Sequence, residues 1–226
     1  MAKDRSRFVC QACGQVSPRW FGRCPGCGAW NTLVEEPGAA LGSRRRAQEP
    51  TRPVPLAQVE ATAGERLSTG STELDRVLGG GIVAGSLVLV GGDPGVGKST
   101  LLLQAASRLA ADGVVLYVSG EESPAQVRLR GSRLGALPDG LYVHSQTELD
   151  PVVQEIRRLR PRVAVVDSIQ TMYKDEVASA PGSVAQVREC SAEFLHLAKS
   201  TGTAIFLVGH VTKDGSMWPE TRATGS

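Results

Sequence analysis

A glycine-rich run at positions 92–100 ends in a lysine and two hydroxyl residues, with the sequence Gly-Asp-Pro-Gly-Val-Gly-Lys-Ser-Thr. Glycines let successive backbone N–H groups turn inward around a phosphate, and a helix that starts here adds the positive end of its dipole. In this spacing Lys98 supplies a charge to the β and γ oxygens, and the Ser99 hydroxyl binds Mg²⁺. We therefore predict a loop that holds a nucleoside triphosphate, with ATP the first candidate. The predicted nucleotide-binding residues are Gly92, Asp93, Pro94, Gly95, Val96, Gly97, Lys98, Ser99 and Thr100.

Carboxylates follow two apolar runs that have the character of strands. The run 163–166 ends in Asp167, as expected for the Walker B carboxylate that holds Mg²⁺ through its water shell. Glu121 and Glu122 come just after the strand predicted at 114–119, where a carboxylate can orient and polarise the attacking water. We place Glu121 slightly ahead of Glu122 in this role. The alternative is that both only complement the dipole of the helix that follows.

A histidine follows the apolar run 204–209, which we predict to be a strand beside the phosphate-loop strand. There His210 can sense the γ-phosphate through a hydrogen bond and pass its state to the next loop. The alternative is a loop histidine without a role. The predicted catalytic residues are Lys98, Glu121, Glu122, Asp167 and His210.

Two tight cysteine pairs occur near the N-terminus, and each is followed by a glycine. Four thiolates in Cys-x2-Cys spacing favour tetrahedral Zn²⁺, which closes the coordination shell and holds together a segment too small to fold otherwise. The rival is two disulfides, which a reducing compartment disfavours. The predicted zinc ligands are Cys10, Cys13, Cys24 and Cys27, and Cys190 lies in a predicted helix as a buried thiol.

Aromatic and basic residues lie in and after the cysteine cluster. Arg19, Trp20, Phe21 and Arg23 stand between the two pairs, and Trp30 follows the second. Aromatic rings interleaved with cations suit contact with nucleic acid. Equally, a small domain without a core needs aromatic rings to pack round its metal site. The sequence leaves both possibilities open.

The elements that position these residues are read from hydrophobic alternation. Short apolar strands alternate with helical stretches beyond residue 66, which predicts an α/β fold with a mostly parallel sheet covered by helices on both faces. The predicted strands are 87–90, 114–119, 141–144, 163–167 and 204–209. One predicted helix follows Lys98, and two others open at Ser123-Pro124 and at Asp150-Pro151, each with an N-cap followed by proline at the first helical position. A fourth spans roughly 183–200 and ends at Gly202. We divide the chain into a Cys₄ unit (1–34), a linker (35–66) and the α/β domain (67–226).

Charge and hydropathy bound the surroundings of the protein. The formal net charge is +2, but residues 1–52 carry nine Lys and Arg against four Asp and Glu. This bias fits an anionic partner such as nucleic acid, and a solvated basic linker gives the same count. No apolar run is long enough to span a membrane, and the N-terminus lacks an apolar signal core. We expect a soluble, cytoplasmic protein.

These motifs together resemble those of the bacterial RadA (Sms) DNA-repair ATPases, a RecA-like branch of P-loop proteins. The resemblance is carried by the Cys₄ cluster and by residues 67–81, 91–100, 119–123, 166–171 and 209–215. It implies DNA-dependent ATP hydrolysis, action on branched recombination intermediates, binding to single-stranded DNA, recombinase and helicase partners, and a hexameric ring. By resemblance, the segments after Asp167 and after His210 are DNA-binding loops, with Lys174 and Lys213 as phosphate contacts.

The C-terminus departs from that family. Family members continue past residue 216 with a Lys-Asn-Arg-Phe-Gly motif and a Lon-protease-like domain, and residues 217–226 match none of this. We therefore expect an ATPase domain that is incomplete at its C-terminus. One alternative is a nucleotide-gated module that binds zinc and DNA without turnover. Another is a signalling ATPase of the KaiC type, which also has paired glutamates but lacks the cysteine cluster.

Overall fold

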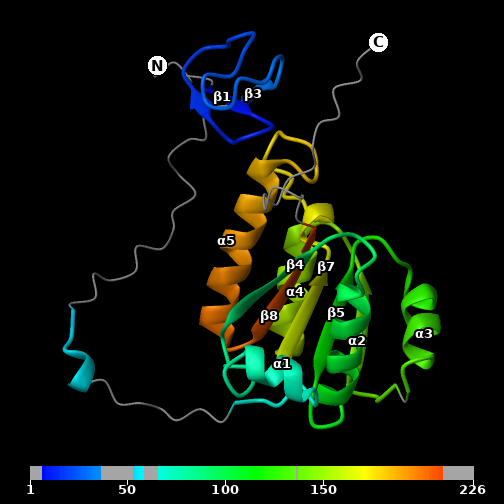
Figure 1. Cartoon of the computed structure of the whole chain (residues 1–226). Coiled ribbons are helices and arrows are strands. Elements are labelled where there is room, and N and C mark those ends of the chain that lie inside the picture. Colours follow the sequence, from blue (N-terminus) through cyan, green and yellow to red (C-terminus); the bar gives the residue numbers. More distant parts are fainter. Residues whose placement is uncertain (1–6, 37–52, 59–65, 136, 211–226) are drawn as a thin grey trace.

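The computed structural model describes residues 7–36, 53–58, 66–135 and 137–210, and all structural statements below concern these residues. Within them lie a small antiparallel ribbon near the N-terminus and a larger α/β domain (Figure 1). Both parts of the predicted fold class are therefore present.

The α/β domain is built on a five-stranded parallel sheet with the order β4-β8-β7-β5-β6. Each of the five predicted strands is confirmed, with ends that shift by no more than two residues. Because all strands run in one direction, their carboxyl ends meet at a single edge, where α/β proteins bind their ligands. The strands are β4 (Leu87–Gly92), β5 (Val115–Ser119), β6 (Leu141–Ser145), β7 (Val163–Asp167) and β8 (Ala204–His210).

Helices cover both faces of this sheet, and alternate residues of each strand enter two separate hydrophobic cores (Figure 1). On β7, Ala164 and Val166 pack with α4 (Leu149–Leu159) and α5 (Val184–Thr201). The intervening Val163 and Val165 pack on the opposite face with α2 (Lys98–Leu109) and α3 (Pro124–Ser132). Near-continuous apolar strands are therefore required here, because both of their faces are buried.

Helix ends follow local chemistry that the sequence partly predicts. Ser123 caps α3 in a capping box with Gln126, and α5 ends at Gly202 in the left-handed conformation, both as predicted. The prediction that Asp150 caps the next helix is wrong, because α4 already begins at Leu149 with Glu148 as its N-cap. A proline in the first turn removes only an N–H that has no partner within the helix, so it does not fix where the helix begins.

A short helix, α1 (Thr72–Val77), was not predicted. The Ser71 hydroxyl accepts a hydrogen bond from the Leu74 N–H and caps it. The Asp75 carboxylate accepts further bonds from the Ser68 hydroxyl at 2.6 Å and the Thr69 N–H at 2.8 Å, and these bonds lower its pKa. Only six residues long, α1 shows too little periodicity to be recognised from hydrophobic spacing.

The N-terminal ribbon is a three-stranded antiparallel sheet with the order β2-β1-β3. Its hydrophobic cluster consists of Cys10, Cys24 and Leu33, with Phe8, Ala12 and Phe21 packed partly against them, and Val9 is buried as well. So small a core cannot hold a fold by hydrophobic burial alone. The strands are β1 (Arg7–Cys10), β2 (Val16–Ser17) and β3 (Leu33–Glu36), of which β3 enters the segment assigned above to the linker.

Two single-turn 3₁₀ helices complete the described elements, η1 (Leu56–Gln58) and η2 (Ile169–Thr171). Of these, η2 follows Asp167 directly and so shapes the sheet edge that carries the predicted site. Among the residues that the structure describes, no helix has both the length and the apolar character that a membrane crossing demands.

Candidate nucleotide site and metal centre

The predicted phosphate loop joins β4 to α2. Gly97 is the N-cap of α2 with φ of 95°, and Gly95 has φ of 82°, so both adopt the left-handed conformation that a Cβ disfavours. The helix begins at Lys98, and the N–H groups of its first turn have no partner within the helix. The loop and the helix start thus form an anion-binding cradle.

Lys98 is buried, and its ammonium group donates to the carbonyl oxygens of Gly92 at 2.7 Å and Asp93 at 2.8 Å. The same Nζ lies 3.4 Å from Nδ1 of His210. This approach follows from the sheet, because β4 and β8 are parallel neighbours with Gly92 opposite His210. The structure therefore places His210 beside Lys98, and β8, which carries His210, is the neighbour of the phosphate-loop strand as predicted.

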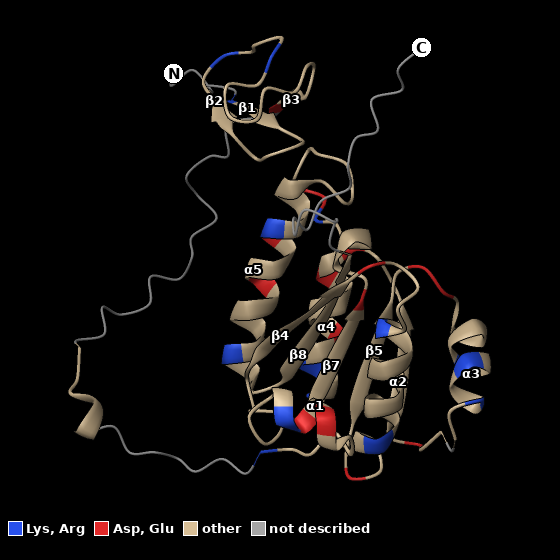
Figure 2. Ribbon diagram, in the orientation of Figure 1, with Lys and Arg blue, Asp and Glu red and all other residues tan. Residues whose placement is uncertain are grey.

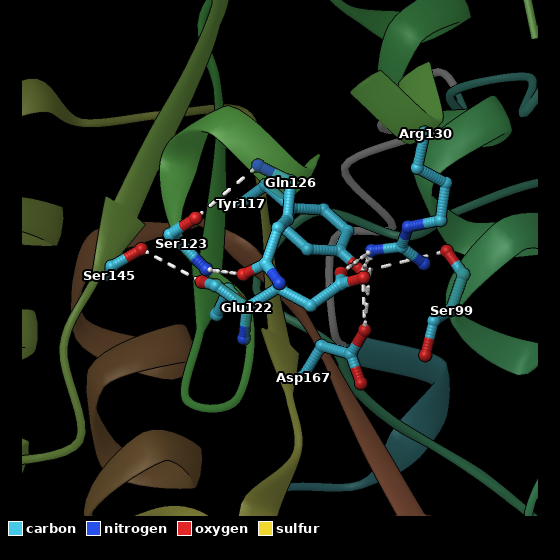
Figure 3. A network of polar contacts seen from close by, with 9 residues as sticks. Ser99, Tyr117, Glu122, Ser123, Gln126, Arg130, Ser145 and Asp167 are labelled. Carbon is cyan, nitrogen blue, oxygen red and sulfur yellow. Dashed lines mark hydrogen bonds and ion pairs between the residues drawn. The ribbon is translucent and has the colours of Figure 1, made fainter. Parts of the chain in front are cut away.

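Asp167 ends β7, and Tyr117 from β5 donates a hydrogen bond of 2.5 Å from its hydroxyl to Oδ2 of Asp167 (Figure 3). Burial, followed by the charge of Asp167, raises the pKa of Tyr117 well above its usual range. The phenol is therefore a permanent proton donor at neutral pH. It fixes the orientation of the Asp167 carboxylate.

Arg130, from α3, joins the two acidic groups of the site (Figure 3). Its Nη2 donates to Oε2 of Glu122 at 2.5 Å and to the Tyr117 hydroxyl at 3.2 Å, and it lies 4.0 Å from Oδ2 of Asp167. Glu122 is thus bound in an ion pair that turns its carboxylate toward α3. A group held in this way is poorly placed to take a proton from water.

Glu121 is exposed, and its recorded partner is the Ser168 hydroxyl, which donates to Oε1 at 3.2 Å. The chain before it is held against β7, since the Gly120 N–H donates to the Asp167 carbonyl at 2.9 Å. A Cβ on Gly120 would lie 1.9 Å from Oγ1 of Thr171, so only glycine permits this approach. The two glutamates therefore differ sharply in their surroundings.

The structure brings these groups together around a cavity of about 170 Å³. Hydroxyl and carboxylate oxygens from Ser99 and Asp167 border it, and these are the hard donors that Mg²⁺ prefers. The buried Nε of Arg130 has no partner among the described residues, which leaves a donor for a ligand oxygen. The predicted ligand residues at this cavity therefore suit Mg²⁺ and a phosphate group. The cavity is lined by Ser99, Ser119, Glu121, Glu122, Arg130 and Asp167.

The four N-terminal cysteines form a second site. Their Sγ atoms all lie within 4.8 Å of one another, with Cys10 and Cys27 3.7 Å apart and Cys13 and Cys24 3.6 Å apart. Tetrahedral Zn–S bonds of about 2.3 Å require S–S separations of about 3.8 Å, whereas a disulfide requires about 2.0 Å. All four are free thiols. The geometry fits a Cys₄ metal centre and excludes the disulfide alternative.

One thiol of this centre is held close to its deprotonated form. Burial of Cys10 raises its pKa, but the Thr32 hydroxyl 3.1 Å away and the N–H groups of residues 12 and 13 outweigh this and lower the pKa to about 6. Thiolates are the form in which cysteine binds metal. The pKa of Cys13 is instead raised to about 12, mainly by burial, and that of Cys27 is raised as well, so only part of the cluster favours the thiolate before a metal binds.

Comparison with known proteins agrees with both sites. The family model described as AAA domain matches residues 50–216, and the rubredoxin metal binding domain matches residues 8–35. The proteins named DNA repair protein RadA from Halalkalibacterium halodurans and Bacillus subtilis are 52% and 51% identical over 96% of this chain and 49% of their own length. That of Listeria monocytogenes is 49% identical over 96% of this chain and 48% of its length.

The chain belongs to the RadA family of AAA-domain proteins. It spans about half the length of the curated relatives that it matches. The RadA resemblance drawn from the motifs is therefore confirmed. Both candidate sites of this RadA-family chain lie within the residues that the two family models match.

Two residues of the candidate nucleotide site, Tyr117 and Arg130, were not predicted from the sequence. Tyr117 lies within an apolar strand and is indistinguishable there from a core residue. Arg130 had a usable signal, because it shares the buried stripe of α3 with Val127 and Gly131 at helical spacing. A charged residue on such a stripe must find a partner.

The remaining candidates lie elsewhere. Lys174 forms an ion pair with Glu176 at 3.1 Å, and Lys213 lies outside the described residues. Cys190 lies on the buried face of α5 and packs in the core, where burial raises its pKa to about 12. This is the inert thiol that its position in a predicted helix indicated.

Replacement of Arg130 by methionine is expected to destabilise this RadA-family chain, because Glu122 and Asp167 would then face each other without a cation. Removing one partner of a deeply buried pair costs about 3–5 kcal/mol, and the partial exposure of Glu122 reduces our expectation to about 1–2 kcal/mol. Urea unfolding measures the loss. We expect Mg²⁺ with nucleotide to restore part of it, since the metal supplies a positive charge near Asp167.

The matched control is Arg128→Met, which removes an exposed arginine from the same helix. It should change the free energy of unfolding by less than about 0.5 kcal/mol. If both variants lose equal stability, the network around Arg130 has no special role.

Proposed function

We propose that this chain binds ATP with Mg²⁺ and hydrolyses it. The observation that carries the proposal is the meeting of three groups at one sheet edge: the P-loop with Lys98, the strand-end carboxylate Asp167, and the free carboxylate Glu121. Each group alone has ordinary structural explanations. Together they supply the parts that phosphoryl transfer to water requires.

Each residue has a distinct role in this proposal. The N–H groups of residues 92–100 bind the phosphates, and Lys98 leaves its two carbonyl partners to contact the β and γ oxygens. Ser99 is a direct ligand of Mg²⁺ and Asp167 holds it through its water shell. The ion, when bound, neutralises charge that develops on the transferred phosphoryl group. Tyr117 and Arg130 keep the Asp167 carboxylate oriented.

We assign the orientation of the attacking water to Glu121. Glu122 already accepts from Arg130, whereas Glu121 faces the cavity with a single neutral donor, Ser168. His210 senses the occupancy of the γ-phosphate position, because its ring shares the surroundings of the Lys98 ammonium group. Its backbone carbonyl accepts from the Gln170 side chain, which links it to η2.

The paired glutamates permit a direct test of this assignment. Glu121→Gln should lower kcat for ATP at least about 100-fold, because the amide cannot accept a proton from water. Glu122→Gln should lower it less than about tenfold. The measurement is steady-state phosphate release with saturating ATP and Mg²⁺. Equal losses in the two variants, or a larger loss in Glu122→Gln, would reverse the assignment.

We further infer from the family that the activity serves DNA repair. The curated relatives are named DNA repair proteins, and the ribbon that precedes the ATPase domain carries a Cys₄ site suited to Zn²⁺. In this proposal single-stranded DNA stimulates hydrolysis, and the protein acts in the cytoplasm on branched recombination intermediates. A homo-oligomeric ring and recombinase or helicase partners belong to the same proposal.

A second candidate function is a nucleotide-gated module that binds DNA without turning ATP over. ATP binding with no phosphate release, with or without single-stranded DNA, would support this module.

A further inference from the structure

Two tryptophans of the N-terminal ribbon remain at its surface. Trp20 is 53% exposed and Trp30 is 70% exposed, whereas Phe21 packs against the small core beside the cysteines. Phe21 therefore packs at the metal site, whereas neither indole covers that site. Leaving two large apolar rings in water is unfavourable unless they contact something.

The two indoles are neighbours. Cζ3 or Cη2 atoms of both six-membered rings lie within 4 Å of the position that a Cβ on Gly22 would occupy, at 3.6 Å for Trp20 and 3.8 Å for Trp30. Because Gly22 has no side chain, nothing of its own separates the two rings. The surface formed by Trp20, Gly22 and Trp30 is called here the indole surface.

The backbone beneath this surface is fixed next to the metal centre. Arg23 and Trp30 face each other in an antiparallel bridge, and the Asn31 N–H donates to the Gly22 carbonyl at 2.8 Å. The next pair along closes the loop that carries two of the cysteines, with the Cys24 N–H donating to the Ala29 carbonyl at 2.8 Å. A rigid support of this kind reduces the entropy lost when a ligand binds.

Arg23 lies beside the indole surface, and Arg19 directly precedes Trp20 in the chain. The Arg23 guanidinium lies 5.9 Å from the centre of the Trp30 ring and is anchored through Nε to the Gly28 carbonyl at 2.9 Å. Arg19 lies 4.9 Å from the centre of the Phe21 ring. Residues 8–34 contain no acidic residue, and Figure 2 shows blue but no red along the loops between β2 and β3. The surface thus combines exposed aromatic faces with positive charge.

We propose that the indole surface binds single-stranded nucleic acid by stacking bases on Trp20 and Trp30, with Arg19 and Arg23 as phosphate contacts. Unpaired bases expose π faces that stack on aromatic side chains, and their backbone is attracted to arginine. A duplex hides its base faces by stacking and pairing, so it offers these two indoles no base to stack on. The assignment of this surface rests on the proposed function, in which the chain binds single-stranded DNA.

The test uses tryptophan emission of the zinc-loaded full chain. The chain has three tryptophans, and every protein in the test carries Trp218→Phe, so that only Trp20 and Trp30 contribute to the emission. Titration with a dT oligonucleotide should quench the emission, because a stacked base deactivates the indole. Trp20→Ala and Trp30→Ala should each raise the dissociation constant about tenfold or more. Trp20→Phe and Trp30→Phe should retain most of the affinity, since a ring remains.

Matched controls separate stacking from folding. Val16→Ala removes another exposed apolar side chain from the ribbon and should leave the affinity unchanged. Zinc content must stay near one per chain in every variant. The anisotropy of a fluorophore-labelled oligonucleotide measures binding anywhere on the protein. If that probe binds while tryptophan emission stays constant, the indole surface does not stack bases and is left as a surface for a protein partner.

The outcome is separate from that of the ATPase proposal. Loss of oligonucleotide affinity in Trp20→Ala and Trp30→Ala supports the indole surface even if the chain hydrolyses no ATP. Unchanged affinity in both alanine variants overturns it, even if single-stranded DNA stimulates hydrolysis, because that stimulation would then act through other residues.

Discussion

Lys98→Ala is expected to reduce ATP turnover at least about 100-fold and to weaken nucleotide binding. The ammonium group is a single point charge at the phosphates, and loss of one preorganised electrostatic contact in a transition state costs about 10²–10³ in kcat. The loss has a structural component as well, since the buried Nζ donates to two loop carbonyls. Phosphate release and the affinity for a labelled ATP analogue measure the two effects.

Lys199→Ala provides the control, because that lysine is exposed in the last turn of α5. It should leave both quantities unchanged. The zinc content of Lys98→Ala should remain that of the unaltered chain, since no residue of the P-loop belongs to the ribbon. Undiminished turnover in Lys98→Ala would show that the chain's ATP chemistry, if any, lies elsewhere.

Cys24→Ser is expected to abolish metal binding and unfold the ribbon. Structural zinc sites contribute about 10–16 kcal/mol to the stability of small domains, far more than the few buried residues of this ribbon can replace. Removing one of four ligands or chelating the metal should therefore expose residues 7–36 to protease. ATP binding should persist in both cases, because the P-loop and Asp167 belong to the α/β domain, whose hydrophobic cores are separate from that of the ribbon.

Cys190→Ala is the matched control for this experiment. It removes a buried thiol from the α/β core and should leave one metal ion per chain. Full metal content in Cys24→Ser, or a ribbon that resists protease after chelation, would contradict a structural Cys₄ centre.

Much of the fold was predictable because the sheet is buried on both faces. Each strand is then a short apolar run, and glycine or proline marks many of its ends, so all five strands were located. The phosphate loop and the cysteine pairs were equally predictable. The chemistry of both motifs depends on residues that are close together in the chain, and their spacing can be seen in the sequence itself.

The details of the site were less predictable because they depend on contacts between distant segments. Tyr117 and Asp167 are fifty residues apart, and only the pairing of β5 with β7 makes them neighbours. The difference between Glu121 and Glu122 likewise arises from Arg130 on α3. Exposure of Trp20 and Trp30 was undecided for the same reason, since a 28-residue metal domain shows little periodicity.

Hydrolysis of ATP with and without single-stranded DNA, by the zinc-loaded chain, tests the central claim most directly. The assay needs Mg²⁺, saturating ATP and the Glu121→Gln variant as the background for contaminating ATPases. We predict phosphate release above that background and a further increase with DNA. ATP binding without release above the Glu121→Gln background, in either condition, would contradict the claim and leave a nucleotide-gated binding module.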